Sequence, residues 1–429
     1  MRYCIKGGEI IDPAGGYLGI GDLLINSEKI EAVGRDLPVE DAKIIDATGK
    51  LVCPGFIDLH THLREPGRED KETVASGTKA ALKGGYTAVS CMANTQPVAD
   101  NRVVIEFILK KAAEAGFAKV YPIGAITKGL KGEELAEMGE MAEAGVVAFS
   151  DDGKTLMNPA VLRSACEYTK LFELPLLLHE EDPNLAGTGA MHEGYWSTVL
   201  GLPGIPSIAE SVMIGRDIQI AGYTGSKLHF CHLSATESVA LVRSAKERGL
   251  AVTAEVTPHH LCFTDEDLQG YDPNLRVSPP VRSEQDRQAL IGGLQDGTID
   301  AVATDHAPHT LEEKHREFPL ALTGMIGLET SAAAVWTELV GKGLMTKVQF
   351  VEKMSVNPAR IINRPGGRVQ PGDLADVVIF DPNAEWTVRS DGFVSRSTNS
   401  PFIGRQLSGK VTDVWVEGVL KICNEKLSE

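Results

Sequence analysis

The sequence has no paired-cysteine motif, because its seven cysteines are scattered along 429 residues without any C-x-x-C spacing. Neither a disulfide framework nor a cysteine-rich zinc site is therefore indicated, and we expect reduced, mostly buried thiols. The sequence also lacks an apolar run close to the ~20 residues that span a bilayer, and its amino terminus, MRYCIKGGEI, lacks a signal-peptide pattern. We therefore expect a cytoplasmic, soluble protein with no membrane partner.

The sequence has fewer basic than acidic residues. Lys and Arg total 42 against 59 Asp and Glu, which gives a net charge of -17. This balance opposes nonspecific binding to nucleic acid or to an anionic membrane. No phosphate-binding loop of the form G-x-x-x-x-G-K-[ST] is present, so nucleotide-dependent chemistry is not indicated. An anionic substrate would need a locally positive pocket.

Short apolar runs alternate with longer segments of helical character in the middle of the chain, which is the pattern of βα units. Eight runs can be counted, and eight strands close a TIM barrel. With 43% apolar side chains, the chain can bury a core of that size. We therefore predict a (β/α)8 barrel over residues 55–365, with strands that begin near Phe56, Tyr86, Ala118, Val146, Leu174, Lys227, Ala251 and Ile299.

The two ends of the chain have a different pattern. Residues 1–54 are rich in Gly, Asp and β-forming residues, as in GGEIIDPAGG and DLLINSEKIEAVG. Residues 366–429 alternate apolar and polar positions, as in GDLADVVIFDP and GKVTDVWVEGVLK, which is typical of half-buried strands. We predict that both ends together form one small β-domain beside the barrel.

Histidines and aspartates close several of the predicted strands, where a TIM barrel gathers its active site. His60 and His62 lie two residues apart, so both imidazoles point to the same side of the first strand. An H-x-H pair alone could equally be two surface or capping histidines, but other strand ends add ligand-type groups. These are His179, His232, Asp305 and the pair Asp151-Asp152.

This set of side chains suits a two-ion metal site. Neutral imidazoles and carboxylates are suitable zinc ligands, and a two-ion site also needs a bridging group. A carboxylate from Asp152 can bridge, but strand parity does not distinguish it from Asp151. His229 has the opposite parity to His232 in the same run, so we interpret it as a packing residue or as support for a ligand.

The motifs around these residues resemble those of the dihydroorotase family within the amidohydrolase superfamily, in its longer bacterial type. The resemblance extends from about Gly8 to Gly418 and is carried by HTHLREPG at 60–67, CMANTQP at 91–97, FSDDG at 149–153, HEED at 179–182, HFCHLS at 229–234, EVTPHH at 255–260 and ATDHAPH at 303–309. It implies two Zn²⁺ per subunit. His60, His62 and Asp305 would hold the first ion, His179 and His232 the second, and Asp152 would bridge them in place of a carboxylated lysine.

The resemblance also implies substrate contacts. Arg64 and Asn94 would hold a carboxylate, since the planar guanidinium of arginine matches a carboxylate bidentately. The other implied contacts are His62, His309, Thr323, Gly324 and Ser278. Ser278 departs from the family pattern, because many dihydroorotases have asparagine there, and serine there is also similar to dihydropyrimidinases and hydantoinases.

By this resemblance the reaction is the reversible hydrolysis of L-dihydroorotate to N-carbamoyl-L-aspartate, the third step of pyrimidine (UMP) biosynthesis. A hydroxide bridging the zinc ions would attack the ring amide, with Asp305 as general acid and base. We also expect a homodimer and a complex with aspartate carbamoyltransferase. Two alternatives stay open: another cyclic amidohydrolase (dihydropyrimidinase, hydantoinase or allantoinase), and an inactive homologue that scaffolds aspartate carbamoyltransferase.

Overall fold

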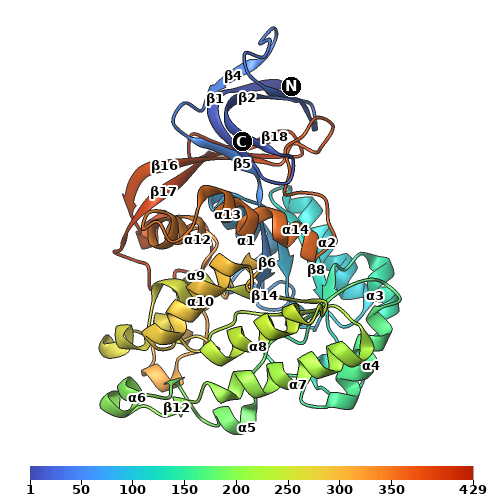
Figure 1. Cartoon of the computed structure of the whole chain (residues 1–429), viewed down its shortest axis with the longest axis vertical. Helices are drawn as coiled ribbons and strands as arrows, with labels where there is room; N and C mark the ends of the chain where they lie inside the picture. The colour runs from blue at the N-terminus through green and yellow to red at the C-terminus, as the bar shows by residue number, and fades with distance from the viewer. Residues whose placement is uncertain (429) are drawn as a thin grey trace.

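The computed structural model describes residues 1–428 as two stacked parts. A β-sheet that contains both chain ends lies above a larger α/β body (Figure 1). Within the described residues, no helix is long and apolar enough to cross a membrane.

The larger body is the predicted barrel. Its eight strands are parallel and follow each other in chain order around the sheet. A bridge between Thr61 and His306, with a 2.9 Å hydrogen bond from His62 N to His306 O, joins the first strand to the last. The prediction of a (β/α)8 barrel is therefore confirmed, with strands β6 (Phe56–Thr61), β7 (Tyr86–Cys91), β8 (Lys119–Gly124), β9 (Ala148–Phe149), β10 (Leu176–Leu178), β13 (Leu228–Phe230), β14 (Val252–Val256) and β15 (Ala301–Val302).

The barrel strands are apolar because helices cover the sheet. All six residues of β6 are buried, as are all six of β7, so these strands lack the alternation of a half-exposed sheet. The longer helices are α1 (Val74–Lys83), α2 (Arg102–Ala115), α4 (Pro159–Thr169), α7 (Ile208–Thr224), α8 (Thr236–Glu247) and α10 (Glu284–Asp296). The shorter ones are α3 (Met138–Ala144), α5 (Pro183–Ala186), α6 (Tyr195–Leu200), α9 (Pro258–Cys262), α11 (Leu311–Lys314), α12 (Ser331–Val335), α13 (Lys347–Val351) and α14 (Asn357–Ile361).

Local sequence explains where α1 begins and ends. The Thr73 side chain accepts a hydrogen bond from the backbone N–H of Ser76, whose hydroxyl in turn accepts from the N–H of Thr73. This capping box satisfies two N–H groups that the first helical turn leaves free. Gly84 caps the carboxyl end, and Gly85 then adopts a φ of +88° that turns the chain into β7.

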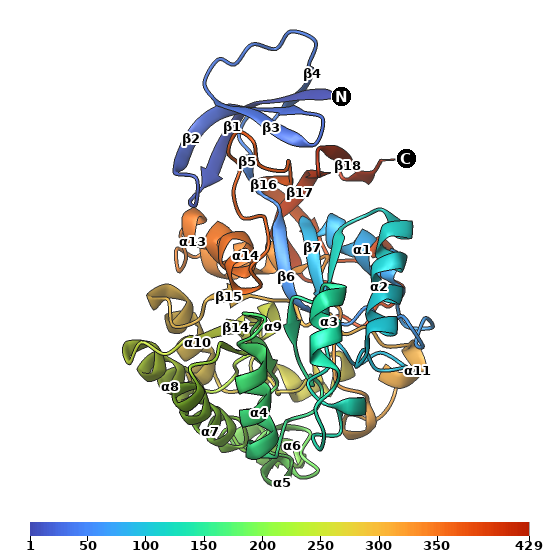
Figure 2. The same cartoon turned by 90° about the vertical axis from the view of Figure 1, so that its right-hand side faces the viewer.

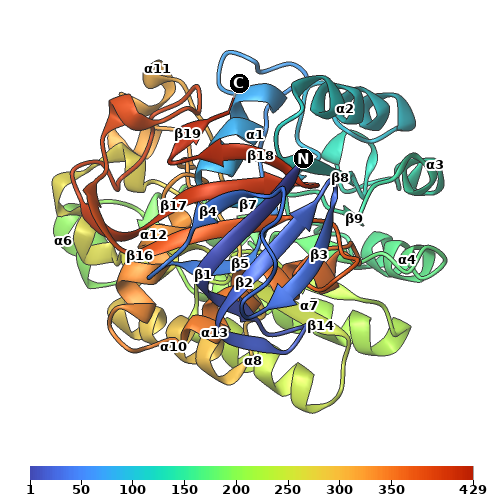
Figure 3. The ribbon, with the colours of Figure 1, turned by 90° about the horizontal axis from the view of Figure 1, so that it is seen from above.

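The upper part is a nine-stranded sheet to which both ends of the chain contribute. The two ends meet where β16 pairs antiparallel with β5, for example Val377 opposite Pro54. Figure 3 shows strands from the start and the end of the chain side by side in this layer. The predicted composite β-domain is thus observed, with strands β1 (Arg2–Asp12), β2 (Tyr17–Asn26), β3 (Lys29–Gly34), β4 (Lys43–Asp46), β5 (Leu51–Pro54), β16 (Val377–Thr387), β17 (Gln406–Val416), β18 (Val419–Cys423) and β19 (Lys426–Leu427).

The connection between the two parts determines which end of the barrel the nine-stranded sheet covers. β5 leads through Gly55 directly into β6, so the nine-stranded sheet covers the amino end of the first barrel strand (Figure 2). The carboxyl ends of the barrel strands lie on the far side. The chain between β16 and β17 also reaches that side, where Asn399 hydrogen-bonds Ala307 and Gly324. This contact was not predicted from the sequence, and the predicted domain boundary at 365/366 stays a prediction.

Candidate metal centre

The six predicted metal ligands converge at the carboxyl ends of the barrel strands. His60 lies in β6 and His62 just after it, while the other four follow β9, β10, β13 and β15. These six residues include two groups whose ligand atoms lie within 4.8 Å of one another, and a third such group joins His60 and Asp152 to Cys231. One group is His60, His62 and Asp305, and the other is Asp152, His179 and His232.

Asp152 lies between the two groups. Its Oδ1 is 3.4 Å from His60 Nε2, 3.6 Å from His179 Nδ1 and 3.5 Å from His232 Nε2. Its Oδ2 is 3.5 Å from His62 Nε2. One carboxylate thus faces ligands of both groups, which is the position of a bridging group.

Asp151 points elsewhere. Its Oδ1 accepts hydrogen bonds from the backbone N–H groups of Ile126 (2.8 Å) and Thr127 (3.0 Å), and its Oδ2 accepts from the Thr127 hydroxyl. The carboxylate therefore fixes the loop after β8. Of the two aspartates that strand parity left open, only Asp152 faces the histidines.

The centre fits a bound cation. His60 Nε2 and Asp152 Oδ1 are buried and have no hydrogen-bond partner within residues 1–428. Although burial opposes the charged imidazole, Asp152 and Asp305 raise the pKa of His60 well above its ordinary value. The two aspartates thus surround His60 with negative charge, which a bound divalent ion would balance. The donor set, imidazole nitrogens and carboxylate oxygens, suits zinc.

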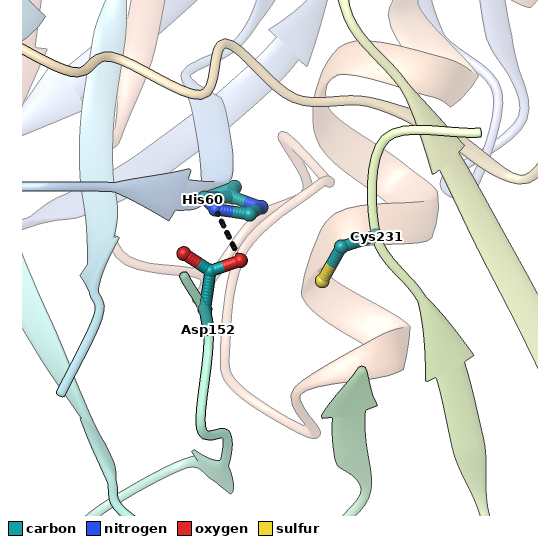
Figure 4. Close-up of side chains that lie close together, drawn as sticks. All are labelled: His60, Asp152 and Cys231. Atoms are coloured by element: carbon teal, nitrogen blue, oxygen red, sulfur yellow. Dashed lines mark ion pairs between the residues drawn. The ribbon is translucent and has the colours of Figure 1, made fainter. Parts of the chain in front are cut away.

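Cys231 lies beside the centre, and the sequence analysis did not single it out from the other buried thiols. Figure 4 shows Asp152 reaching toward His60 while the Cys231 sulfur points into the same space. Burial raises the pKa of this thiol, so the neutral form is expected at neutral pH.

A second layer of side chains orients the ligands. His60 Nδ1 donates to Glu255 Oε1 at 2.8 Å, which leaves Nε2 free to face the centre. Glu255 also accepts from His229 Nε2 at 3.1 Å, so His229 supports the centre indirectly and does not face it. His62 Nδ1 lies 2.9 Å from Asn94 Oδ1, so Asn94, which also lines the hollow as a predicted substrate contact, helps to orient His62.

Three site residues adopt a left-handed backbone conformation that side chains rarely take. Their φ angles are +63° for Arg64, +35° for His232 and +48° for Asp305. Such conformations cost of order 1–3 kcal/mol each and cluster at functional sites. In each case the conformation occurs just after a barrel strand, and the side chain lines the hollow at the carboxyl ends of the strands.

A hollow of about 280 Å³ opens above the centre. Its lining includes every predicted site residue except His60, which lies beneath it, and adds three that the sequence analysis did not select: Gly153, Glu181 and Ala307. Glu181 belongs to the HEED segment, so only its place in that motif could have indicated it. The hollow has the size of a site for a small molecule.

One wall of the hollow is positively charged. Arg64 Nε donates to Pro308 O at 3.2 Å, and neither terminal guanidinium nitrogen has an acceptor within residues 1–428. Burial lowers the pKa of Arg64 to about 10, which still leaves it charged at neutral pH. The two terminal nitrogens of Arg64 can therefore bind an anion bidentately.

His309 lies on the same side and is neutral. Burial, with Arg64 and Lys71 nearby, lowers its pKa to about 3. His309 Nε2 donates to Thr323 O at 2.9 Å, and its Nδ1 accepts from Lys71 Nζ at 3.2 Å. The tautomer is thus fixed by the surroundings. Ser278 contributes one hydroxyl, which donates to Glu181 Oε2 over a long 3.5 Å.

The fold and this centre define a class. A (β/α)8 barrel with histidines and aspartates converging at the carboxyl ends of its strands, flanked by a small β-domain, is an amidohydrolase.

Sequence comparison identifies the family within this class. Residues 49–238 match the family described as "Dihydro-orotase-like". A dihydroorotase from Pelotomaculum thermopropionicum is 53% identical over 95% of this chain and 96% of its own length. A dihydroorotase from a Thermoanaerobacter species is 47% identical over 100% and 99%. The chain belongs to the dihydroorotase family.

The structurally similar proteins reported next are named as enzymes other than dihydroorotase. The L-hydantoinase (dihydropyrimidinase) of Arthrobacter aurescens superposes with a TM-score of 0.90, at 24% identity over 100% of this chain and 98% of its own. The dihydropyrimidinase of Brevibacillus agri gives 0.85, at 24% identity over 100% and 96%. At that identity the likeness shows the fold alone.

Proposed function

We propose that this chain is a dihydroorotase, which hydrolyses the cyclic amide of L-dihydroorotate to N-carbamoyl-L-aspartate and catalyses the reverse ring closure. The main support is that one hollow is lined both by predicted metal ligands and by Arg64, whose terminal guanidinium nitrogens have no acceptor within residues 1–428. A small cyclic amide that bears a carboxylate fits both sides at once. This is the third step of pyrimidine biosynthesis.

The proposed centre holds two zinc ions. His60, His62 and Asp305 would bind one, His179 and His232 the other, and Asp152 would face both. When bound, such ions supply an activated water and polarise an amide carbonyl. The proposal is supported by the convergence of the six ligand atoms and by the unpartnered His60 Nε2 and Asp152 Oδ1.

The protein groups would divide the remaining work. Arg64 binds the substrate carboxylate, and His309, Thr323, Gly324 and Ser278 line the ring. Asp305 takes the proton of the attacking water at a carboxylate oxygen and returns it to the leaving ring nitrogen. Its Oδ1 lies 3.0 Å from His62 Nε2, and the histidines around it hold its pKa below the ordinary value against the effect of burial. Asp305 is thus ionised and ready to accept a proton.

The alternatives predict different substrates. Dihydrouracil, hydantoin and allantoin lack the ring carboxylate, so a dihydropyrimidinase, hydantoinase or allantoinase has no use for the free guanidinium of Arg64. An inactive scaffold for aspartate carbamoyltransferase has no need of a complete ligand set. Cytoplasmic location, a homodimer and a complex with that carbamoyltransferase stay predictions.

A panel assay tests the proposal. The zinc-loaded protein is offered dihydroorotate, dihydrouracil, hydantoin and allantoin side by side, and kcat/KM is measured for each. We expect kcat/KM for dihydroorotate to exceed the others by at least the roughly 10- to 150-fold that loss of a charge-assisted bidentate contact gives. Faster turnover of a carboxylate-free ring would favour the alternative amidohydrolase, and no turnover of any ring would favour the scaffold.

A further inference from the structure

Lys314 is a buried cation behind the wall of the hollow. It ends the short helix α11, five residues after His309, and only 1% of it is exposed. Its ammonium donates to Leu322 O at 2.8 Å and to Gly324 O at 2.9 Å, with Arg276 O at 3.5 Å. A single side chain thus holds the carbonyls on both sides of Thr323.

The ammonium group of Lys314 is stabilised by hydrogen bonds to these carbonyl groups. Among residues 1–428, the hydrogen-bond partners of its ammonium are these backbone carbonyls, and it forms no ion pair with a carboxylate. Burying an unpaired charge is costly, and burial lowers the pKa of Lys314 to about 7. An apolar side chain would avoid that cost, so the position points to a role beyond filling space.

Asn399 holds the same segment from the other side. Its Nδ2 donates to Gly324 O and to Ala307 O, both at 3.1 Å, and its Oδ1 accepts from the backbone N–H of His309 at 3.2 Å. Gly324 O is therefore held by two donors. The Asn399 side chain also ties the segment at 324 to the loop that carries Asp305 and His309.

The held segment is part of the proposed substrate site. Thr323 and Gly324 line the hollow, and Thr323 O accepts the hydrogen bond that fixes the His309 tautomer. Gly324 has a φ of +128°, and a Cβ there would lie 2.7 Å from Ala307 Cβ. The segment thus approaches His309 and Ala307 so closely that its backbone forms the wall, which explains why it must be held from behind.

We propose that Lys314 is a positioning residue for substrate binding, which acts with Asn399 to fix the Thr323–Gly324 wall of the hollow. Neither side chain is among the residues that line the hollow, so both act through the backbone. The inference rests on the proposed function. A wall that contacts the substrate before and during reaction affects binding in both states, so its loss raises KM more than it lowers kcat.

The test compares two buried lysines. Lys353 is also buried, at 5% exposed, and its ammonium donates to Ile299 O, near the amino end of β15 and far from the hollow. Lys314→Met and Lys353→Met remove the same kind of bond at opposite ends of the barrel. With zinc-loaded protein and dihydroorotate, we expect Lys314→Met to raise KM about ten-fold or more, with kcat within about three-fold and metal content unchanged. Lys353→Met should lower the melting temperature and leave KM near the wild-type value.

Equal KM values in the two variants would overturn the inference. If Lys314→Met does not fold, Asn399→Asp makes the same comparison, because it keeps the acceptor for His309 N–H and loses the donor to Gly324 O. Its matched control is Asn357→Asp, whose amide donates to Asp300 O at 2.8 Å near the amino end of β15.

A second readout separates this inference from the proposed function. Hydrogen exchange of the peptide that covers residues 320–326 should rise in Lys314→Met and not in Lys353→Met. If wild-type protein does not turn over dihydroorotate, the proposed function fails while this exchange measurement still decides the role of Lys314. Unchanged exchange together with unchanged KM would leave Lys314 with a structural role only.

Discussion

Asp152 Oδ1 lies 3.4 Å from His60 Nε2, and both buried atoms lack a hydrogen-bond partner within residues 1–428. Buried polar atoms are almost always satisfied, so two facing each other without partners indicate a missing third group. His60 cannot turn away, because its Nδ1 is held by Glu255 at 2.8 Å. The two atoms are therefore arranged for a shared cation.

The neighbouring aspartates give a matched test of the bridging role. Asp152→Ala should remove at least one of two bound ions, since it takes away the oxygens that face both ligand groups. Asp151→Ala should keep close to two ions but lower the melting temperature, because it frees the N–H groups of Ile126 and Thr127. Metal analysis after exhaustive dialysis measures the content. The reverse pattern would show that Asp151 is the bridging residue.

Arg64 should act on substrate and not on the metals. Arg64→Met removes a charge-assisted bidentate contact worth roughly 1.5–3 kcal/mol, so kcat/KM for dihydroorotate should fall roughly 10- to 150-fold with two ions retained. Arg68→Met is the control, because it removes a nearby cation that Glu313 already engages at 2.9 Å. An unaltered kcat/KM in Arg64→Met would mean that the substrate carboxylate binds elsewhere.

Asp305 combines two roles that Asp305→Asn separates. The asparagine keeps one acceptor oxygen for metal binding but cannot take up a proton at neutral pH. We expect the metals to be largely retained while kcat falls by the ~10²- to 10⁴-fold typical of a lost general acid or base. Two ions together with near-normal hydrolysis would assign the proton transfer to another group.

That group is not expected to be His309. The resemblance implies a substrate contact for this histidine, and in the structure Lys71 and Thr323 engage both ring nitrogens while its pKa is lowered to about 3. A neutral, doubly engaged imidazole suits binding better than proton transfer.

The barrel was predictable because its strands are buried on both faces. Each of the eight runs is a short, mainly apolar segment, several of them end in polar residues, and each corresponds to a strand in the predicted order. The small strands β11 (Met191–His192) and β12 (Gly204–Ile205) were not predicted, since two-residue strands leave no periodic pattern. The return of Asn399 to the barrel mouth was also missed, because nothing local in a sequence indicates a contact 75 residues away.

The convergence of the six predicted ligands could be predicted from their positions at strand ends, whereas the side chains that support them could not. Glu255 is a single acidic residue inside an apolar strand, and its contacts with His60 and His229 come from strands distant in sequence. The choice between Asp151 and Asp152 needed the three-dimensional loop after β8, because neighbouring residues beyond a strand end have no fixed parity. Lys314 was missed because a lysine in the segment LEEK is usually solvent-exposed.

Glu329 should make stability depend on pH. It accepts hydrogen bonds from Val394 N and Ser395 N, and burial raises its pKa from 4.5 to about 7. The folded protein thus binds this proton more tightly than the unfolded chain, so the contribution is present below about pH 4.5 and is lost as pH rises through 7.

Glu329→Gln imitates the protonated form and removes that dependence. The difference in urea midpoint between this variant and wild type should therefore grow in favour of the variant from pH 5 to pH 8. Comparing the two proteins cancels the titration of all other groups. A difference that stays constant over this range would contradict a raised Glu329 pKa.

Reconstitution of metal-free protein tests the central claim most directly. The protein is stripped with a chelator, zinc is added back in steps, and dihydroorotate hydrolysis is measured at each step. We predict negligible activity without metal and a rise that ends at two equivalents of zinc per chain, because the six predicted ligands form two groups and Asp152 faces histidines of both. Full activity at one equivalent or fewer, or in the presence of the chelator, would contradict a two-ion dihydroorotase.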